Sequence, residues 1–130
     1  MNALTIDTGV DAHADLLALL PEQVVPHITE RMLDNAGTAA ALRLLASVHR
    51  TEWHAHVSYG LIAWNPIIIW ARDRDRRLAN EARVTLEIAA SLDGYPHAHV
   101  NLAYAVKVTS YHRFLVILDA LRIAKQGVSA

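Results

Sequence analysis

Two consecutive stretches of the chain alternate between apolar and polar residues, and this alternation constrains the fold more than any other feature of the sequence. It runs from Arg83 to Asp93 and again from Ala98 to Thr109. A period of two is typical of strands that bury one face, because successive side chains point to opposite faces of a sheet. The alternation predicts two antiparallel strands, Arg83–Leu92 and Ala98–Thr109, that turn at Asp93–His97.

Helices are predicted before this sheet. Capping residues, prolines and glycines divide the N-terminal part into helices at about Asp11–Leu20, His27–Asn35 and Ala39–Glu52. Thr8-Gly9-Val10-Asp11 has the spacing of a capping box. Gly37 is expected to supply the left-handed residue that ends the second helix, and Thr38 is expected to cap the third.

A further helix is predicted after the sheet, where the period returns to that of a helix. One face of it is apolar, and Gly127 is a plausible stop. The residues on that face are Tyr111, Phe114, Leu115, Leu118 and Leu121, with His112, Arg113 and Asp119 on the other.

The predicted fold is therefore α+β in a single domain, 1–130, with three N-terminal helices, an antiparallel sheet of about four strands and a C-terminal helix. The β-branched run Ile67-Ile68-Ile69 supplies one of the other strands. The alternative is an all-α helical bundle, since the chain is rich in Ala and holds only five Gly. Against the bundle, a helix at 83–93 would carry a second apolar stripe at Val84, Ile88 and Leu92.

Composition excludes several classes of function. The chain has no Cys, which removes disulfide frameworks, Cys-ligated zinc and Cys nucleophiles. Its net charge of −1 gives no general attraction to nucleic acid. The stretch Trp53–Ala71 is uncharged and close to transmembrane length, but its histidines and Asn65–Pro66 argue against a span. No signal peptide is recognised, so a cytoplasmic location is expected.

The histidines are the one chemical anomaly. The tetrapeptide His-Ala-His-Val occurs twice, placing His54 with His56 and His97 with His99. On a strand, residues i and i+2 share a face, so each pair could chelate one ion, and Glu52 extends the first series. Two adjacent strands of this kind would form a site for a divalent transition metal such as Zn²⁺, Ni²⁺, Cu²⁺ or Fe²⁺. The simpler interpretation is that these imidazoles are solvated or bonded to backbone, with no cofactor.

The remaining chemistry is sparse, and whether the protein is an enzyme stays open. Arg72-Asp73-Arg74-Asp75-Arg76-Arg77 is the only run of charges, typical of a self-paired solvated loop and, less directly, of a phosphate or nucleic-acid contact. The apolar content of 53% is high for the size. The sequence therefore predicts a non-catalytic structural or assembly subunit that associates with itself or docks on a larger protein complex. The alternative is a small metal-dependent enzyme or metal-binding protein that uses the His-x-His pairs.

Overall fold

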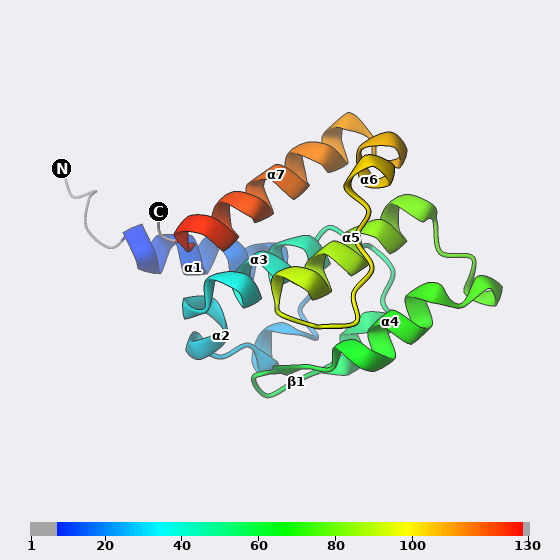
Figure 1. The fold of residues 1–130 in the computed structure, drawn as a ribbon. Coiled ribbons are helices and arrows are strands. Elements are labelled where there is room, and N and C mark those ends of the chain that lie inside the picture. The colour runs from blue at the N-terminus through cyan, green and yellow to red at the C-terminus, as the bar shows by residue number, and fades with distance from the viewer. Residues whose placement is uncertain (1–7, 129–130) are drawn as a thin grey trace.

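A computed structural model describes residues 8–128, apart from the side chains of residues 8–11 and of residue 76, so the predicted capping box at Thr8–Asp11 lies outside the described side chains. The described part holds seven α-helices, three short 3₁₀ helices and one two-stranded hairpin (Figure 1). These are α1 (Thr8–Leu19), η1 (Val25–His27), α2 (Glu30–Asp34), α3 (Ala36–Leu45), η2 (Glu52–His56), β1 (Val57–Ser58), β2 (Leu61–Ile62), α4 (Trp64–Arg72), η3 (Arg74–Arg76), α5 (Asn80–Leu92), α6 (Leu102–Val108) and α7 (Tyr111–Gln126).

The core is built around α3, which lies against α7 on one side and α5 on the other (Figure 1). Every residue from Ala39 to Leu45 except Arg43 is fully buried. The three consecutive alanines, Ala39–Ala41, let neighbouring backbones approach closely. Close approach also explains Gly37, because a Cβ there would lie 2.4 Å from the carbonyl oxygen of Leu92.

The predicted α+β fold is wrong, and the mostly helical alternative is the nearer description. Residues 83–92 belong to α5, in which six consecutive residues, Thr85–Ala90, are buried. The helix is contacted by α3, α4 and α6, so it has almost no solvent-facing side. A helix covered on several sides needs no polar face, and the second stripe at Val84 and Ile88 is therefore no argument for strands.

The second predicted strand is also wrong. Residues 98–101 are extended loop, and Asn101 caps α6 by accepting a hydrogen bond at Oδ1 from the Tyr104 backbone N–H, with N···O 3.0 Å. The sequence of this short helix shows no division into an apolar and a polar face. In the structure most of its apolar side chains are exposed, and only Ala105 is buried. The run Ile67–Ile69 is likewise helical, within α4.

The sheet of about four strands is reduced to the β1–β2 hairpin. Val57 pairs with Ile62 and Ser58 with Leu61. The two turn residues between the strands have positive φ, 42° at Tyr59 and 91° at Gly60, as a tight hairpin turn requires. Together η2, the hairpin and α4 contain the uncharged stretch Trp53–Ala71. No helix within residues 8–128 is long and apolar enough to cross a membrane.

The N-terminal helices exist, but several of their boundaries differ from those predicted. The second begins only at Glu30, where Thr29 accepts a hydrogen bond from the Met32 backbone N–H. Asn35, rather than Thr38, caps α3, so Gly37 lies in the first turn of α3 and does not end the second helix. The third helix stops near Leu45 instead of reaching Glu52. There the buried Trp53 indole donates to the Val48 carbonyl at 3.2 Å, which holds the chain in a turn.

Candidate interaction surface

The predicted metal site requires both histidine pairs to lie on strands, and in the structure neither pair does. Glu52, His54 and His56 lie in η2, where residues i and i+2 do not share a face. His97 and His99 lie in the extended loop between α5 and α6. Within the described residues, no group of three or more His, Asp or Glu side chains could hold a metal ion. Metal binding by these residues therefore stays a prediction without a site to support it.

The two histidine pairs instead belong to separate local networks. In the first, Glu52 is paired with Arg50, whose hydrogen bond lowers the pKa of that carboxyl. The neighbouring His54 ring packs edge-on against Trp53 with centroids 4.4 Å apart, and burial lowers its pKa. In the second, the backbone of His97 accepts from Arg72, and the backbone N–H of His99 donates to a buried glutamate.

A different feature stands out on α7, which is apolar on two faces. The inner face packs on α3 and is buried; its residues are Val116, Ile117, Ala120 and Ile123. The outer face is the apolar stripe recognised in the sequence, and four of its five side chains are exposed. Tyr111 is exposed by 76%, and Leu115, Leu118 and Leu121 by 42–45%. A helix that uses one apolar face for the core normally has a polar opposite face, so the outer stripe needs a separate explanation.

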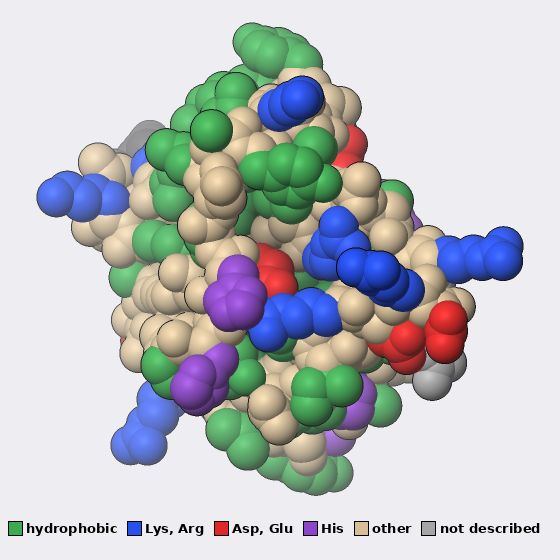
Figure 2. All heavy atoms as spheres, turned by 45° about the vertical axis from the view of Figure 1, so that its right-hand side comes forward, with side chains coloured by type: hydrophobic (Ala, Val, Ile, Leu, Met, Phe, Trp, Pro, Cys, Tyr) green, Lys and Arg blue, Asp and Glu red, His purple; other side chains and the backbone are tan. Residues whose placement is uncertain are grey.

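Helix α6 extends this stripe. Leu102 and Val106 lie four residues apart on α6, hence on one side of it, and are exposed by 72% and 55%. A hollow of about 280 Å³ joins the two helices and is lined by Val106, Thr109, Tyr111 and Phe114. In Figure 2 hydrophobic side chains gather over the upper part of the molecule, where α6 and the start of α7 lie. We call this the outer apolar surface: Leu102, Val106, Tyr111, Leu115, Leu118 and Leu121.

Polar anchors fix α7 so that this surface faces outward. Arg113 donates from Nε to Glu81 Oε1 at 3.2 Å and also contacts the Ser47 hydroxyl after α3. Ser110 caps α7 and donates to the same Glu81. Burial alone would raise the pKa of Glu81, but the hydrogen bonds from Ser110 and Arg113 outweigh it and lower that pKa. The start of α7 is thus tied to α5 and to the end of α3.

The other end of α7 is held by a charged pair. Asp119 accepts from Arg43 Nε on α3 at 3.1 Å and also pairs with Arg122, one turn further along α7. Asp119 lies beside the stripe, and Arg122, four residues after Leu118, lies at its C-terminal end. The rotation of α7 about its axis is therefore set from both ends, and the outer apolar surface is a fixed feature of the fold.

Sequence reasoning found the α7 stripe but not its exposure, and it missed α6 entirely. A usable signal was present: Val116, Ile117, Ala120 and Ile123 form a second apolar stripe in the same helix. Two stripes on one helix predict either complete burial or an external partner. No protein-family model, curated protein or solved structure matches this chain. The surface must therefore be interpreted from its own chemistry.

Proposed function

We propose that the protein is a non-catalytic assembly subunit that associates with a second copy of itself through the outer apolar surface. One observation carries the proposal: α7 exposes a continuous apolar stripe while its opposite face already fills the core. The six side chains of the surface, exposed by 42–76%, amount to an apolar patch on the order of several hundred Å². Patches of that size on a monomer are commonly interaction sites.

The spacing along α7 suits pairing with an identical helix. If two copies of α7 cross antiparallel about a two-fold axis at Leu118, that residue meets its own copy. Leu115, three residues before, then faces the partner's Leu121, three residues after. Tyr111 and Lys125 are each seven residues from the axis, so the Lys stem and charge would lie against the Tyr ring. The four exposed residues of the stripe then each have a neighbour of suitable size, and Phe114 faces Arg122 of the other copy.

The size of the surface fits an interface between two copies. A stable interface buries about 800 Å² on each partner, with an apolar centre and a polar rim. The α7 stripe and the exposed residues of α6 supply the centre. Asp119, Arg122, Lys125 and Lys107 supply a rim of three positive charges and one negative. Asp119 pairs with Arg122 within the chain, which leaves two lysines whose charges lie at the edge of the interface in contact with water.

Sedimentation velocity over a concentration series tests the proposal. The unmodified protein is expected to shift from monomer to dimer as concentration rises. The L115D/L118D variant is expected to remain monomeric, because four carboxylates would have to be desolvated at the centre of the interface. Leu61→Asp is the matched control, since Leu61 is 66% exposed at the tip of the hairpin, outside the outer apolar surface. A monomer at every concentration, or a dimer that survives L115D/L118D, would overturn the proposal.

A further inference from the structure

A second site lies apart from the α7 stripe, in a hollow between α4, η3, α5 and the loop that leads into α6. Its volume is about 330 Å³, within the range of small-ligand pockets. Basic groups line one side, from Arg72 at the end of α4, Arg74 in η3 and Arg83 on α5. Three guanidinium groups from three separate elements thus meet at one pocket, although only two of them belong to the charge run noted in the sequence.

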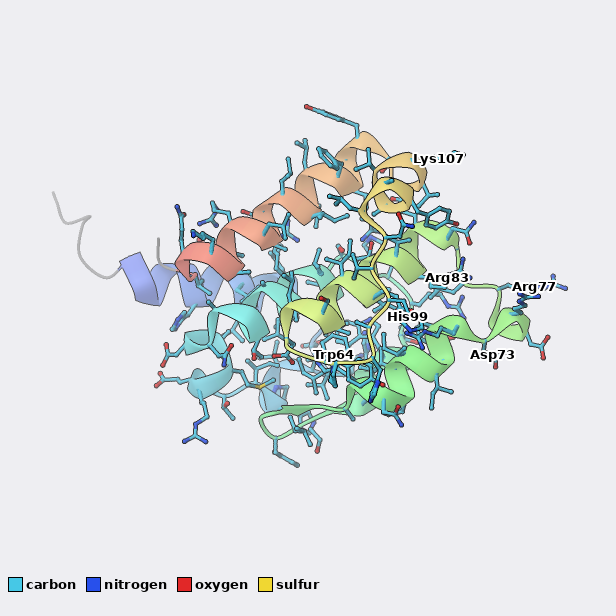
Figure 3. All side chains as sticks on the ribbon, in the orientation of Figure 1. Trp64, Asp73, Arg77, Arg83, His99 and Lys107 are labelled. Carbon is cyan, nitrogen blue, oxygen red and sulfur yellow. The ribbon has the colours of Figure 1, made fainter. Side chains whose placement is uncertain are left out.

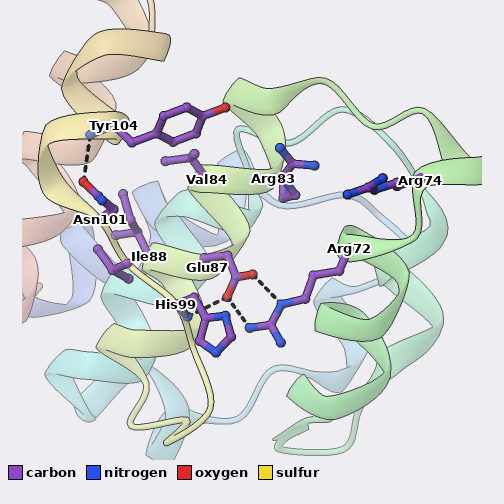
Figure 4. Close-up of a pocket in the computed structure, with 10 residues that line it drawn as sticks. Arg72, Arg74, Arg83, Val84, Glu87, Ile88, His99, Asn101 and Tyr104 are labelled. Carbon is purple, nitrogen blue, oxygen red and sulfur yellow. Dashed lines mark hydrogen bonds and ion pairs between the residues drawn. The ribbon is translucent and has the colours of Figure 1, made fainter.

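One of these arginines is already engaged, and it shapes the floor of the pocket. Arg72 binds Glu87 through two bonds, Nε to Oε2 at 2.7 Å and Nη2 to Oε1 at 2.9 Å. The Glu87 carboxylate also accepts the His99 backbone N–H at 2.9 Å. Burial would raise the pKa of Glu87, but these hydrogen bonds outweigh it and lower that pKa. Figure 4 shows this network joining α4, α5 and the loop.

The other two arginines have no acidic partner among the described residues. The guanidinium group of Arg83 donates only to the amide oxygen of Asn80, at 2.6 Å. The side chain of Arg74 makes no hydrogen bond or ion pair within the described part of the chain, although its backbone carbonyl accepts from the Arg77 N–H. Figure 4 shows the two side chains next to each other at the same end of the pocket. With three arginines and one glutamate lining it, the pocket carries a formal charge of +2.

The rest of the lining is largely apolar and aromatic. Val84 and Ile88 come from α5, Val100 from the loop and Tyr104 from α6. These are the residues of the second stripe of α5 and of the misassigned strand. Their main-chain positions are fixed, since Asn101 caps α6 and the loop is held by Glu87. A ligand that fits must therefore join an anionic end to an apolar or aromatic body.

We propose that this pocket binds a small organic phosphate, with the phosphoryl group between Arg74 and Arg83 and the organic body against Tyr104. Guanidinium groups match phosphate oxygens in planar, paired hydrogen bonds. A phosphate monoester is close to a dianion at neutral pH, so it balances two free arginines. A carboxylate would balance only one. The pair Arg72–Glu87 is neutral overall and holds the floor rigid for this ligand.

Calorimetric titration tests this with three probes: phenyl phosphate, inorganic phosphate and benzoate. Phenyl phosphate is expected to bind most tightly, because it alone satisfies both ends of the pocket. The R74Q/R83Q variant is expected to weaken its binding by at least about tenfold, since both charge-assisted contacts to the phosphoryl group are lost. Tyr104→Ala is expected to weaken phenyl phosphate but leave inorganic phosphate unchanged.

The control is Arg77→Gln, which removes one charge from the same run. Arg77 points away from the pocket (Figure 3), so its loss is expected to leave phenyl phosphate binding unchanged. Unaltered thermal melting of R74Q/R83Q shows that the two substitutions leave the fold intact. Absence of phenyl phosphate binding at millimolar concentration would overturn the proposal. So would an equal loss in Arg77→Gln, since binding would then follow general charge, or binding of benzoate as tight as that of phenyl phosphate.

Discussion

Ile117 and Leu118 are neighbours on α7, similar in size and hydrophobicity, yet they lie in opposite environments. Ile117 is 6% exposed and packs toward α3, whereas Leu118 is 45% exposed and faces outward. The first contributes to folding of the single chain. The second contributes little to it, because its environment changes less between the unfolded and folded states. The two faces of one helix thus separate folding from association.

The same contrast applies to the polar groups around α7. Glu81 and Arg113 tie the buried side of the helix to α5 and to Ser47, with side chains exposed by 30% and 15%. Asp119 and Arg122 lie at the margin, with side chains about 40% exposed. Water screens the second pair far more than the first. Substitutions on the inner side of α7 are therefore expected to lower the stability of the fold strongly. Those on the outer side are expected to have small effects on stability that depend on salt.

The largest expected effect is at the inner face. Ile117→Ala should lower the free energy of unfolding by about 2–4 kcal/mol, because a buried side chain is lost and a cavity is left against α3. Leu118→Ala, made next to it, should lower it by under about 1 kcal/mol in the monomer. Urea unfolding of both variants at a concentration where the protein is monomeric measures the difference. Equal losses would mean that the two faces are not distinct.

The next effect concerns the polar anchor. Glu81→Gln should destabilise the fold by about 1–2 kcal/mol at neutral pH, because Ser110 and Arg113 lose a charged acceptor. The pKa of Glu81 is lowered in the folded protein. Its stabilising contribution is therefore complete above the ordinary glutamate pKa and is lost as pH falls through the lowered value.

Urea unfolding at neutral pH and at about pH 3 checks this sign. The gap between the unmodified protein and Glu81→Gln should narrow at the acid pH, since protonation removes from Glu81 the charge that the Gln variant already lacks. A gap that widens on acidification would contradict the assignment of Glu81 as an ionised anchor.

A smaller effect links the outer apolar surface to stability. If two copies associate, the melting temperature should rise by about 2–4 °C for each tenfold increase in protein concentration. Only folded chains associate, so a higher concentration stabilises the folded state further. L115D/L118D should melt at the same temperature at every concentration. Differential scanning calorimetry over a concentration series measures both, and a concentration-independent melt in the unmodified protein would count against the outer face as an interface.

The smallest expected effect is at the margin of α7. Asp119→Asn should cost under about 1 kcal/mol, since its pairs with Arg43 and Arg122 are partly exposed. The loss should shrink further in high salt, which screens such pairs. Thermal melting in low and high salt measures it. A loss as large as that of Ile117→Ala would show that the margin of α7 is as important for folding as its buried face.

The sequence by itself determined the elements whose signals are local. The helix that begins after Ser110 and ends at Gly127 could be predicted because its cap, its apolar stripe and its stop are all encoded within 16 residues of helix and their flanks. The absence of thiol chemistry could be predicted from composition. The existence of the helix at the N-terminus and of those around 30–45 could be predicted in the same way, although Asn35, rather than the predicted Thr38, caps α3.

Only the tertiary structure decided which apolar faces are covered. The alternating residues of 83–92 predict a strand, because a helix there would have apolar residues on two sides. Such a helix is stable in this fold because α3, α4 and α6 all contact α5. The α7 stripe was found in the sequence, but its exposure depends on which of two apolar faces meets α3. The arginine pocket joins Arg74 to Arg83 and Tyr104 across three elements, so no local spacing encodes it. Periodicity reports hydrophobicity along a chain, whereas burial depends on neighbours that are distant in sequence.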